Sequence, residues 1–216
     1  MIGGTWRALA HYAMVEADYP LTDPHGFSLS VSETRDHARQ LIDAQPDKLV
    51  KISGISQMRA EYLPDAAAML LPLLDAIEPE RLIFSSWGIR EGLLYSRLSD
   101  LQRALDPLLA GVHAFAEPRD APVVDAARVV GWTVDLANGK GKRNERLRLA
   151  SAQLAAALQR VEPNLRVNHA TEWSLDKRWI DCSPRDRAMM CAALYGSIGK
   201  TELPDKLDLL ADSEDL

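Results

Sequence analysis

Residues 88–95 read Gly88-Ile89-Arg90-Glu91-Gly92-Leu93-Leu94-Tyr95, and residues 2–7 read Ile2-Gly3-Gly4-Thr5-Trp6-Arg7. Each stretch joins an apolar, strand-like run to a glycine turn and then to a helix. Backbone N–H groups point outward at the N-terminus of such a helix, where they suit a phosphate group. The two stretches therefore predict strand–turn–helix units whose turns are able to hold an anion.

A family resemblance rests on these two stretches and on Arg59-Ala60-Glu61-Tyr62-Leu63-Pro64, which lies between them. Together they resemble the second half of the exopolyphosphatase/guanosine-pentaphosphate phosphatase (Ppx/GppA) family, within the actin, Hsp70 and sugar-kinase superfamily. The resemblance runs from residue 2 to about residue 98, and more loosely to about residue 200. It implies the fold class: a partial RNase H-like α/β half-domain followed by an all-α helical domain.

The motifs that carry the chemistry of this family are absent from the sequence. Family members begin with a phosphate-binding hairpin of the Asp-x-Gly-Ser-Asn type, then have a catalytic glutamate and an Asp-x-Gly-Gly-Gly-Ser hairpin. None of these segments occurs here. The resemblance therefore implies a C-terminal portion of the enzyme that has no catalytic residue of its own.

Size and composition exclude several classes of protein. The 216 residues form one large domain or two small ones, and no apolar run approaches the ~18–20 residues that cross a bilayer. Cys182 and Cys191 are expected to be free thiols in a reducing cytoplasm. The net charge of −6 argues against general nucleic-acid binding, although residues 99–201 carry an excess of basic residues that leaves room for a local polyanion patch.

Apolar periodicity divides the chain into a mixed half and a helical half. The mixed half is predicted to have strands over 27–31 and 81–86, and helices over 5–17, 33–44, 47–52, 64–77 and 90–98. The helical half is predicted to have helices over 101–115, 123–137, 143–161 and 185–196. Ser32 is expected to cap the second helix, Pro64 to begin the fourth, and Pro72 to kink it. We place the domains at 1–99 and 100–201, with an acidic tail over 202–216.

The expected sheet is incomplete. Two strands, with a third fragment at Ile2, are too few for the five-stranded sheet of the family. Because a bare sheet edge is prone to pairing and aggregation, we expect a partner chain or a rearranged segment to cover it.

Six candidate phosphate-binding residues lie in the mixed half: Gly3, Gly4, Thr5, Arg59, Arg90 and Glu91. The glycines and Thr5 cradle a phosphate at a helix N-terminus, or form a tight turn selected for packing. In the family, this region lines the cleft between the first two domains. Arg90 faces that cleft with Glu91 fixing it, or the two side chains pair to hold the helix against the sheet. Arg59 faces the same cleft, or is a solvated surface arginine.

Four more candidates lie in the helical half: Arg166, His169, Lys177 and Arg178. Cations on a rigid frame suit a chain of phosphates; the alternative is a solvated helical face. The neighbouring Trp173 and Trp179, with Trp132, are expected to be buried. Many members of the family that the sequence resembles have here a domain similar to a metal-dependent phosphohydrolase, which is marked by a His-Asp dipeptide. No histidine of this chain is followed by aspartate, so the comparison implies no metal site in this chain.

The resemblance implies a phosphohydrolase that acts on inorganic polyphosphate or on pppGpp, and the residues do not distinguish the two substrates. Mg²⁺ is expected for the parent enzyme, but not bound by this chain alone. We expect the chain alone to be inactive and to work as a homodimer or with a missing N-terminal half. The alternative is a non-catalytic dimerisation or polyanion-docking module.

Overall fold

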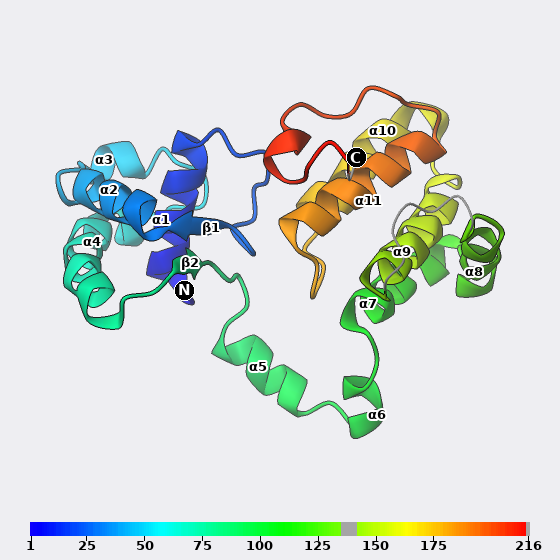
Figure 1. The fold of residues 1–216 in the computed structure, drawn as a ribbon, viewed down its shortest axis with the longest axis horizontal. Helices are drawn as coiled ribbons and strands as arrows, with labels where there is room; N and C mark the ends of the chain where they lie inside the picture. Colours follow the sequence, from blue (N-terminus) through cyan, green and yellow to red (C-terminus); the bar gives the residue numbers. More distant parts are fainter. Residues whose placement is uncertain (135–141, 215–216) are drawn as a thin grey trace. The chain divides into compact units, whose positions relative to one another are not determined.

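A computed structural model describes residues 1–134 and 142–214 and divides the chain into two units, Met1–Ser96 and Arg97–Leu216. Figure 1 shows the elements of both units in sequence colours. None of the described helices combines the length and the apolar character that a membrane span requires.

The first unit is mainly helical and contains a small antiparallel sheet. Its elements are α1 (Gly4–Glu16), β1 (Ser28–Ser30), α2 (Val31–Ile42), α3 (Pro46–Leu49), α4 (Gln57–Ile77), β2 (Arg81–Ile83) and α5 (Ile89–Ser96). Leu29 of β1 lies opposite Leu82 of β2, and Ile2 forms a parallel bridge with Ser85. Both predicted strands and the fragment at Ile2 are present, although each strand is shorter than predicted. The small sheet fits a partial α/β domain, and the RNase H-like fold stays a prediction.

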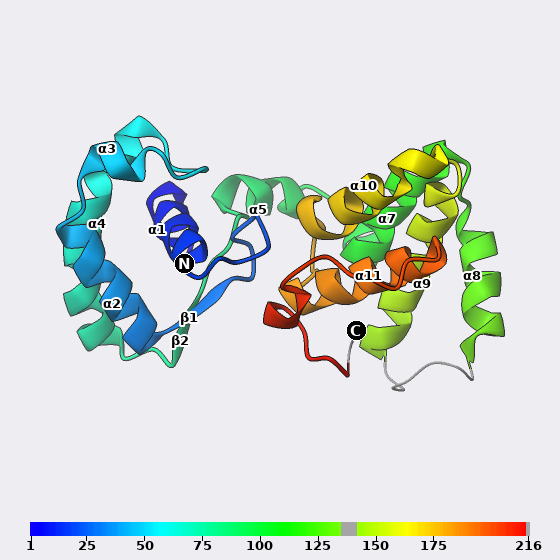
Figure 2. The ribbon, with the colours of Figure 1, turned by 90° about the horizontal axis from the view of Figure 1, so that it is seen from above.

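The core of the first unit lies where α4 packs against α1 and α2. Figure 2 shows α2 and α4 side by side. Leu9, Leu41, Leu63 and Leu70 meet there, and each is fully buried. Phe84, which follows β2, is also buried, so the short sheet closes one side of this helical core.

Two expected helix starts in this unit are wrong. Helix α4 begins at Gln57, so Pro64 lies inside it together with Pro72. Ala60, Leu63, Ala67, Leu70 and Leu74 form a buried stripe along α4. Their packing outweighs the hydrogen bonds that the two prolines remove.

Helix α2 begins earlier than expected, because its N-cap is Ser30 and not Ser32. The Ser30 hydroxyl accepts a hydrogen bond from the Glu33 N–H at 3.2 Å, and the Glu33 carboxylate accepts one from the Ser30 N–H at 2.8 Å. These reciprocal bonds form a complete capping box. The strand therefore passes into the helix without an intervening loop.

Only helices and turns occur in the part of the second unit that the structure describes. The main helices are α6 (Asp100–Arg103), α7 (Pro107–Ala116), α8 (Val123–Trp132), α9 (Lys142–Leu158), α10 (Arg166–Thr171) and α11 (Pro184–Ser197). Short turns are η1 (Glu117–Arg119), η3 (Pro163–Leu165), the π-helical turn η4 (Glu172–Asp176) and η5 (Leu207–Leu209). Helix α9 is central, because α7, α8 and α11 all pack against it.

The predicted helix over 101–115 is two helices. Pro107 begins α7, and the Asp106 carboxylate caps it by accepting the Leu109 N–H at 3.0 Å. The last three residues of the predicted helix 123–137 lie outside the described residues. In the acidic tail, Leu207, Leu210 and Ala211 are buried.

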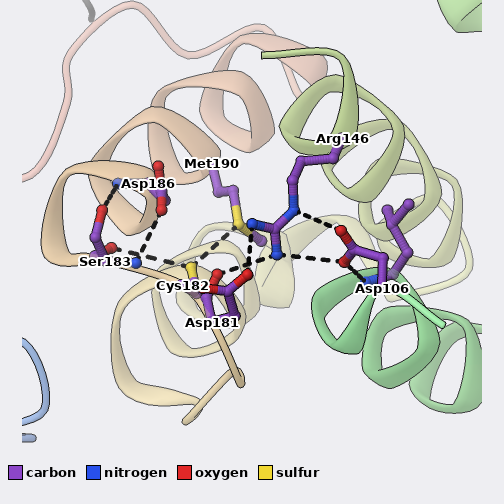
Figure 3. A network of polar contacts seen from close by, with 8 residues as sticks. Asp106, Arg146, Asp181, Cys182, Ser183, Asp186 and Met190 are labelled. Carbon is purple, nitrogen blue, oxygen red and sulfur yellow. Dashed lines mark hydrogen bonds and ion pairs between the residues drawn. The ribbon is translucent and has the colours of Figure 1, made fainter. Parts of the chain in front are cut away.

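A polar network around Arg146 ties three parts of the second unit together (Figure 3). Arg146 of α9 contacts Asp106 at the start of α7 at 2.9 Å and Asp181 before α11 at 2.9 Å. It also donates to the Asp181 carbonyl at 3.1 Å. The capping box of Ser183 and Asp186 then begins α11. Arg146 thus fixes the spacing of α7, α9 and the loop before α11.

Two of the three tryptophans that were predicted to be buried are buried. Trp173 and Trp179 are 6% and 3% exposed, whereas Trp132 is 84% exposed. Helix α8 buries only Ala126, and Trp132 lies in its last turn, about 120° around the helix from Ala126. The prediction for Trp132 was therefore wrong, because α8 is covered on one side alone.

Candidate functional site

A cavity of about 310 Å³ lies in the first unit, where α1 and α5 begin. We call it the Gly3–Gly88 cavity. It is lined by Ile2, Gly3, Arg7, Ser85, Ser86, Trp87, Gly88, Ile89, Arg90 and Glu91.

The pairing of the N-terminal residues with the end of β2 creates this cavity. The Ser85 N–H donates to the Met1 carbonyl at 3.0 Å, next to the bridge between Ile2 and Ser85. Both segments then continue into a glycine turn and a helix. Gly3 has φ 122°, a conformation that side chains rarely adopt, so this turn requires glycine. Two turns that are far apart in the sequence thus become neighbours.

Glu91 occupies the N-terminus of α5. Its carboxylate accepts the Gly88 N–H at 2.7 Å. This bond, a bond from its own N–H and the nearby charges of Arg90 and Arg7 hold the pKa of Glu91 below its usual range. The carboxylate is therefore ionised at neutral pH and takes the place that an anion would have at this helix end.

Two arginines supply positive charge to the cavity. Arg7 is half-buried in α1, and Arg90 is exposed at the start of α5. Arg59 does not line the cavity. Its guanidinium lies against Gly4, where an added Cβ would come within 2.9 Å of the Arg59 Nε atom. Gly4 and Thr5 form the first turn of α1 and are not among the lining residues.

A polar network that the sequence analysis did not select lies behind the cavity. Asp23 is buried, and its carboxylate accepts hydrogen bonds from the Ser86 hydroxyl and, at 3.2 Å, from the His25 N–H. The His25 Nδ1 atom lies 3.4 Å from the Ser85 hydroxyl and 3.4 Å from the Ser86 nitrogen. In the sequence, Asp23 and His25 indicate only a turn. The packing of that turn beside β2 gives them partners.

His11 adds a titratable group to the same part of α1. Burial is the main cause that lowers the pKa of His11, with smaller effects from Arg7 and Arg59, and Asp23 opposes the shift. The ring fits tightly against Gly54, where an added Cβ would lie 2.5 Å from the His11 Nε2 atom. His11 is therefore favoured in its neutral form, which leaves the positive charge here to the arginines.

The four candidates of the helical half lie in the second unit and have different environments. The Arg166 guanidinium donates to the carbonyls of Val161 and Gln159, both at 2.9 Å, just after α9 ends. His169 Nδ1 lies 3.0 Å from a Glu172 carboxylate oxygen, and the Lys177 ammonium lies 4.7 Å from the centre of the Phe115 ring. Arg178 is exposed. His169 and Lys177 line one hollow, whereas Arg166 binds backbone carbonyls.

The cavity does not fit the Mg²⁺ ion that the resemblance implies. Glu91 is the single carboxylate among its lining residues, and it already binds the Gly88 amide. Mg²⁺ prefers several oxygen ligands, and two arginines disfavour a cation. No group of three or more His, Cys, Asp or Glu residues within residues 1–134 and 142–214 is placed to hold a metal ion.

Comparison with known proteins supports the family resemblance. Residues 1–101 match the Ppx/GppA phosphatase family. The chain is also similar to Retrograde regulation protein 2 of Saccharomyces cerevisiae (strain ATCC 204508 / S288c), with 31% identity over 121 residues. That match covers 53% of this chain and 21% of the yeast protein, so the chain spans about a fifth of the length of this relative. Residues 1–101 therefore match the family that the sequence resembles, which confirms the resemblance over that part of the chain.

Proposed function

We propose that the chain is the C-terminal part of an exopolyphosphatase-like phosphohydrolase, and that its Gly3–Gly88 cavity binds a phosphate group of inorganic polyphosphate or pppGpp. The observation that carries this proposal is the pairing of Ile2 with Ser85. It brings two glycine turns, two helix N-termini and two arginines to one cavity. Helix N-termini and guanidinium groups both favour phosphate.

The size of the cavity suits one end of a longer anion. A volume of about 310 Å³ accommodates a terminal phosphate or two, but not a whole polyphosphate chain. The bound phosphate would replace the Glu91 carboxylate at the Gly88 amide. Arg7 and Arg90 would then neutralise part of its charge.

Hydrolysis needs more than this cavity. Phosphoryl transfer depends on positioning the phosphate and neutralising its charge from several sides. The family hairpins and the catalytic glutamate do not occur in the sequence. We therefore propose that the chain is cytoplasmic and is inactive alone. A second copy or an N-terminal half would complete the site and bring Mg²⁺.

Binding and activity assays test this proposal together. Tripolyphosphate should bind the chain at low salt, and Arg7→Ala or Arg90→Ala should each weaken binding by about tenfold. Arg39→Ala is the matched control, because Arg39 is exposed on α2 and pairs with Asp36. No phosphate should be released from polyphosphate or pppGpp with Mg²⁺ until a Ppx/GppA first domain is added. Equal loss of binding in all three variants would contradict the assignment of the cavity.

A non-catalytic dimerisation or polyanion-docking module is the second candidate. The name of the yeast relative describes regulation and not hydrolysis. Helix α5 also buries none of its residues, and Ile89, Leu94 and Tyr95 are 90%, 66% and 54% exposed. Sedimentation analysis separates the two candidates. A stable dimer that releases no phosphate even with the first domain added would favour the module.

A further inference from the structure

A second hollow, of about 540 Å³, lies entirely within the second unit. We call it the Phe115 hollow. It is bounded by the end of α7, by η1, by α10 and by the π-helical turn η4. The Gly3–Gly88 cavity belongs to the first unit, so the two places do not share a residue.

The floor of this hollow is a rigid group of aromatic rings. The ring of Phe115 meets those of Trp173 and Trp179 edge-on, with centroid distances of 5.1 Å and 5.6 Å. The Trp179 indole donates to the Trp173 carbonyl at 2.7 Å. The buried Arg187 donates to the Leu175 carbonyl of η4 at 2.7 Å. The π-helical turn is thereby fixed, and such turns are frequent at functional sites.

Two cations lie on this floor. The Arg119 guanidinium carbon is 3.8 Å from the centre of the Phe115 ring, and the Lys177 ammonium is 4.7 Å from it. Neither Arg119 nor Lys177 has an ion pair in the described parts of the chain, although the carboxylates of Glu172 and Asp176 also line the hollow. Other exposed arginines of this unit, such as Arg128 and Arg160, have a carboxylate partner. Like charges on one ring repel each other, so an anion bound between them is favoured.

His169 gives the hollow an aromatic wall. Its ring lies 5.3 Å from that of Trp173 and is tilted by 34°, and its side chain is 35% exposed. Glu172 holds the ring at Nδ1. One face of the imidazole is therefore supported by Trp173, and the exposed side is available to a flat ligand. Nucleic acid bases stack on such aromatic faces and on guanidinium planes.

We propose that the Phe115 hollow binds a nucleoside phosphate. The phosphate would lie between Arg119 and Lys177, and the base would stack on His169. A volume of about 540 Å³ suits a mononucleotide. An inorganic phosphate chain would use the two cations but leave the aromatic wall without a role. The site is independent of the proposed function, because it shares no residue with the Gly3–Gly88 cavity.

Calorimetric titration of the full chain carrying Arg7→Ala and Arg90→Ala, which remove the cations of the Gly3–Gly88 cavity, with GMP and with pyrophosphate at low salt tests this proposal. Arg119→Ala and Lys177→Ala should each weaken the binding of both ligands by about tenfold. His169→Ala should weaken GMP binding by about tenfold and leave pyrophosphate binding unchanged. His169→Phe keeps an aromatic face and should restore GMP binding. Arg128→Ala is the control for a general loss of positive charge on this unit.

Several results would overturn the proposal. GMP that shows no saturable binding at low salt would eliminate the site. Pyrophosphate that binds as tightly as GMP, with His169→Ala harmless to both, would indicate a site for inorganic anions. Circular dichroism of each variant separates lost contacts from lost folding. Arg7→Ala and Arg90→Ala should not change GMP binding at this hollow, so failure here is distinguishable from failure of the proposed function.

Discussion

Glu91 and Arg90 are neighbours in the sequence but act in opposite directions on the Gly3–Gly88 cavity. Glu91 turns its carboxylate to the Gly88 amide, whereas Arg90 adds positive charge to the lining. Because the pKa of Glu91 is lowered, its negative charge persists at neutral pH. A phosphate that enters the cavity would therefore compete with the Glu91 carboxylate for the Gly88 N–H.

The first prediction concerns this competition. Glu91→Gln should raise the affinity for tripolyphosphate about threefold at low salt, because it removes a like charge from the cavity. Glu16→Gln, at the far end of α1, is the control and should change nothing. Calorimetric titration measures both. Weaker binding in Glu91→Gln would show that the carboxylate positions Arg90 instead of competing with the ligand.

The second prediction concerns the cysteines. Neither cysteine forms a disulfide, Cys182 is 2% exposed and Cys191 is fully buried. Burial raises the pKa of Cys191 to about 11. The Cys191 thiolate, which is the form that reacts with disulfide reagents, is therefore almost absent at pH 8. Both thiols should react with a chromogenic disulfide only after denaturant unfolds the second unit, and rapid reaction in the native protein would contradict this burial.

At the scale of the element, the start of α2 depends on a single hydroxyl. Ser30 ends β1 and caps α2, so one residue belongs to the sheet and to the helix boundary. Ser32 lies inside the first turn and is exposed. The two serines therefore differ in role although they are two positions apart.

The third prediction separates these serines. Ser30→Ala should lower the free energy of unfolding of the first unit by about 1 kcal/mol, because the Glu33 N–H loses its acceptor. Ser32→Ala should stay within about 0.5 kcal/mol of the original protein. Urea unfolding followed by circular dichroism measures both values. Equal effects of the two substitutions on the free energy of unfolding would contradict the assignment of the cap to Ser30 alone.

The fourth prediction concerns the pH dependence of the same cap. Hydrogen bonds from the Ser30 side chain and backbone lower the pKa of Glu33 in the folded state. The contribution of Glu33 is therefore present above its unfolded pKa of about 4.3 and is lost as pH falls through the lower folded pKa. Glu33→Gln should make the stability of the first unit less dependent on acid. Unfolding curves between about pH 3 and pH 7 test this, with Glu61→Gln as the control.

At the scale of the whole molecule, the chain has two packing centres. In the first unit α4 packs against α1 and α2, and in the second unit α9 packs against α7, α8 and α11. The Arg146 network belongs to the second unit alone (Figure 3). Each unit therefore has its own source of stability.

The fifth prediction is that the two units unfold separately. Arg146→Ala should lower the stability of the second unit by about 2 kcal/mol, because it leaves Asp106 and Asp181 without their shared cation. The transition of the first unit should not move. Ser30→Ala should lower the stability of the first unit and leave the transition of the second unit in place. Calorimetry of the full chain distinguishes the transitions, and a single transition that both variants shift equally would contradict this independence.

The local signals in the sequence determined much of this protein. Helical periodicity placed α1, α9 and α11, and alternation indicated β1. The glycine turns at Gly3 and Gly88 carried the family resemblance, which the match over residues 1–101 confirms. These features could be predicted because they depend on residues close together in the chain.

Packing between distant segments decided the rest. The continuation of α4 through Pro64 depends on a buried stripe that only its neighbours create, and the exposure of Trp132 depends on how much of α8 is covered. Composition does not show that Ile2 pairs with Ser85, or that a turn places His25 beside β2. The sequence alone therefore determined most of the helices, the glycine turns and the family resemblance. Only the tertiary structure decided which turns share a cavity, because contacts between remote residues are set by the packing of whole elements and not by their local pattern.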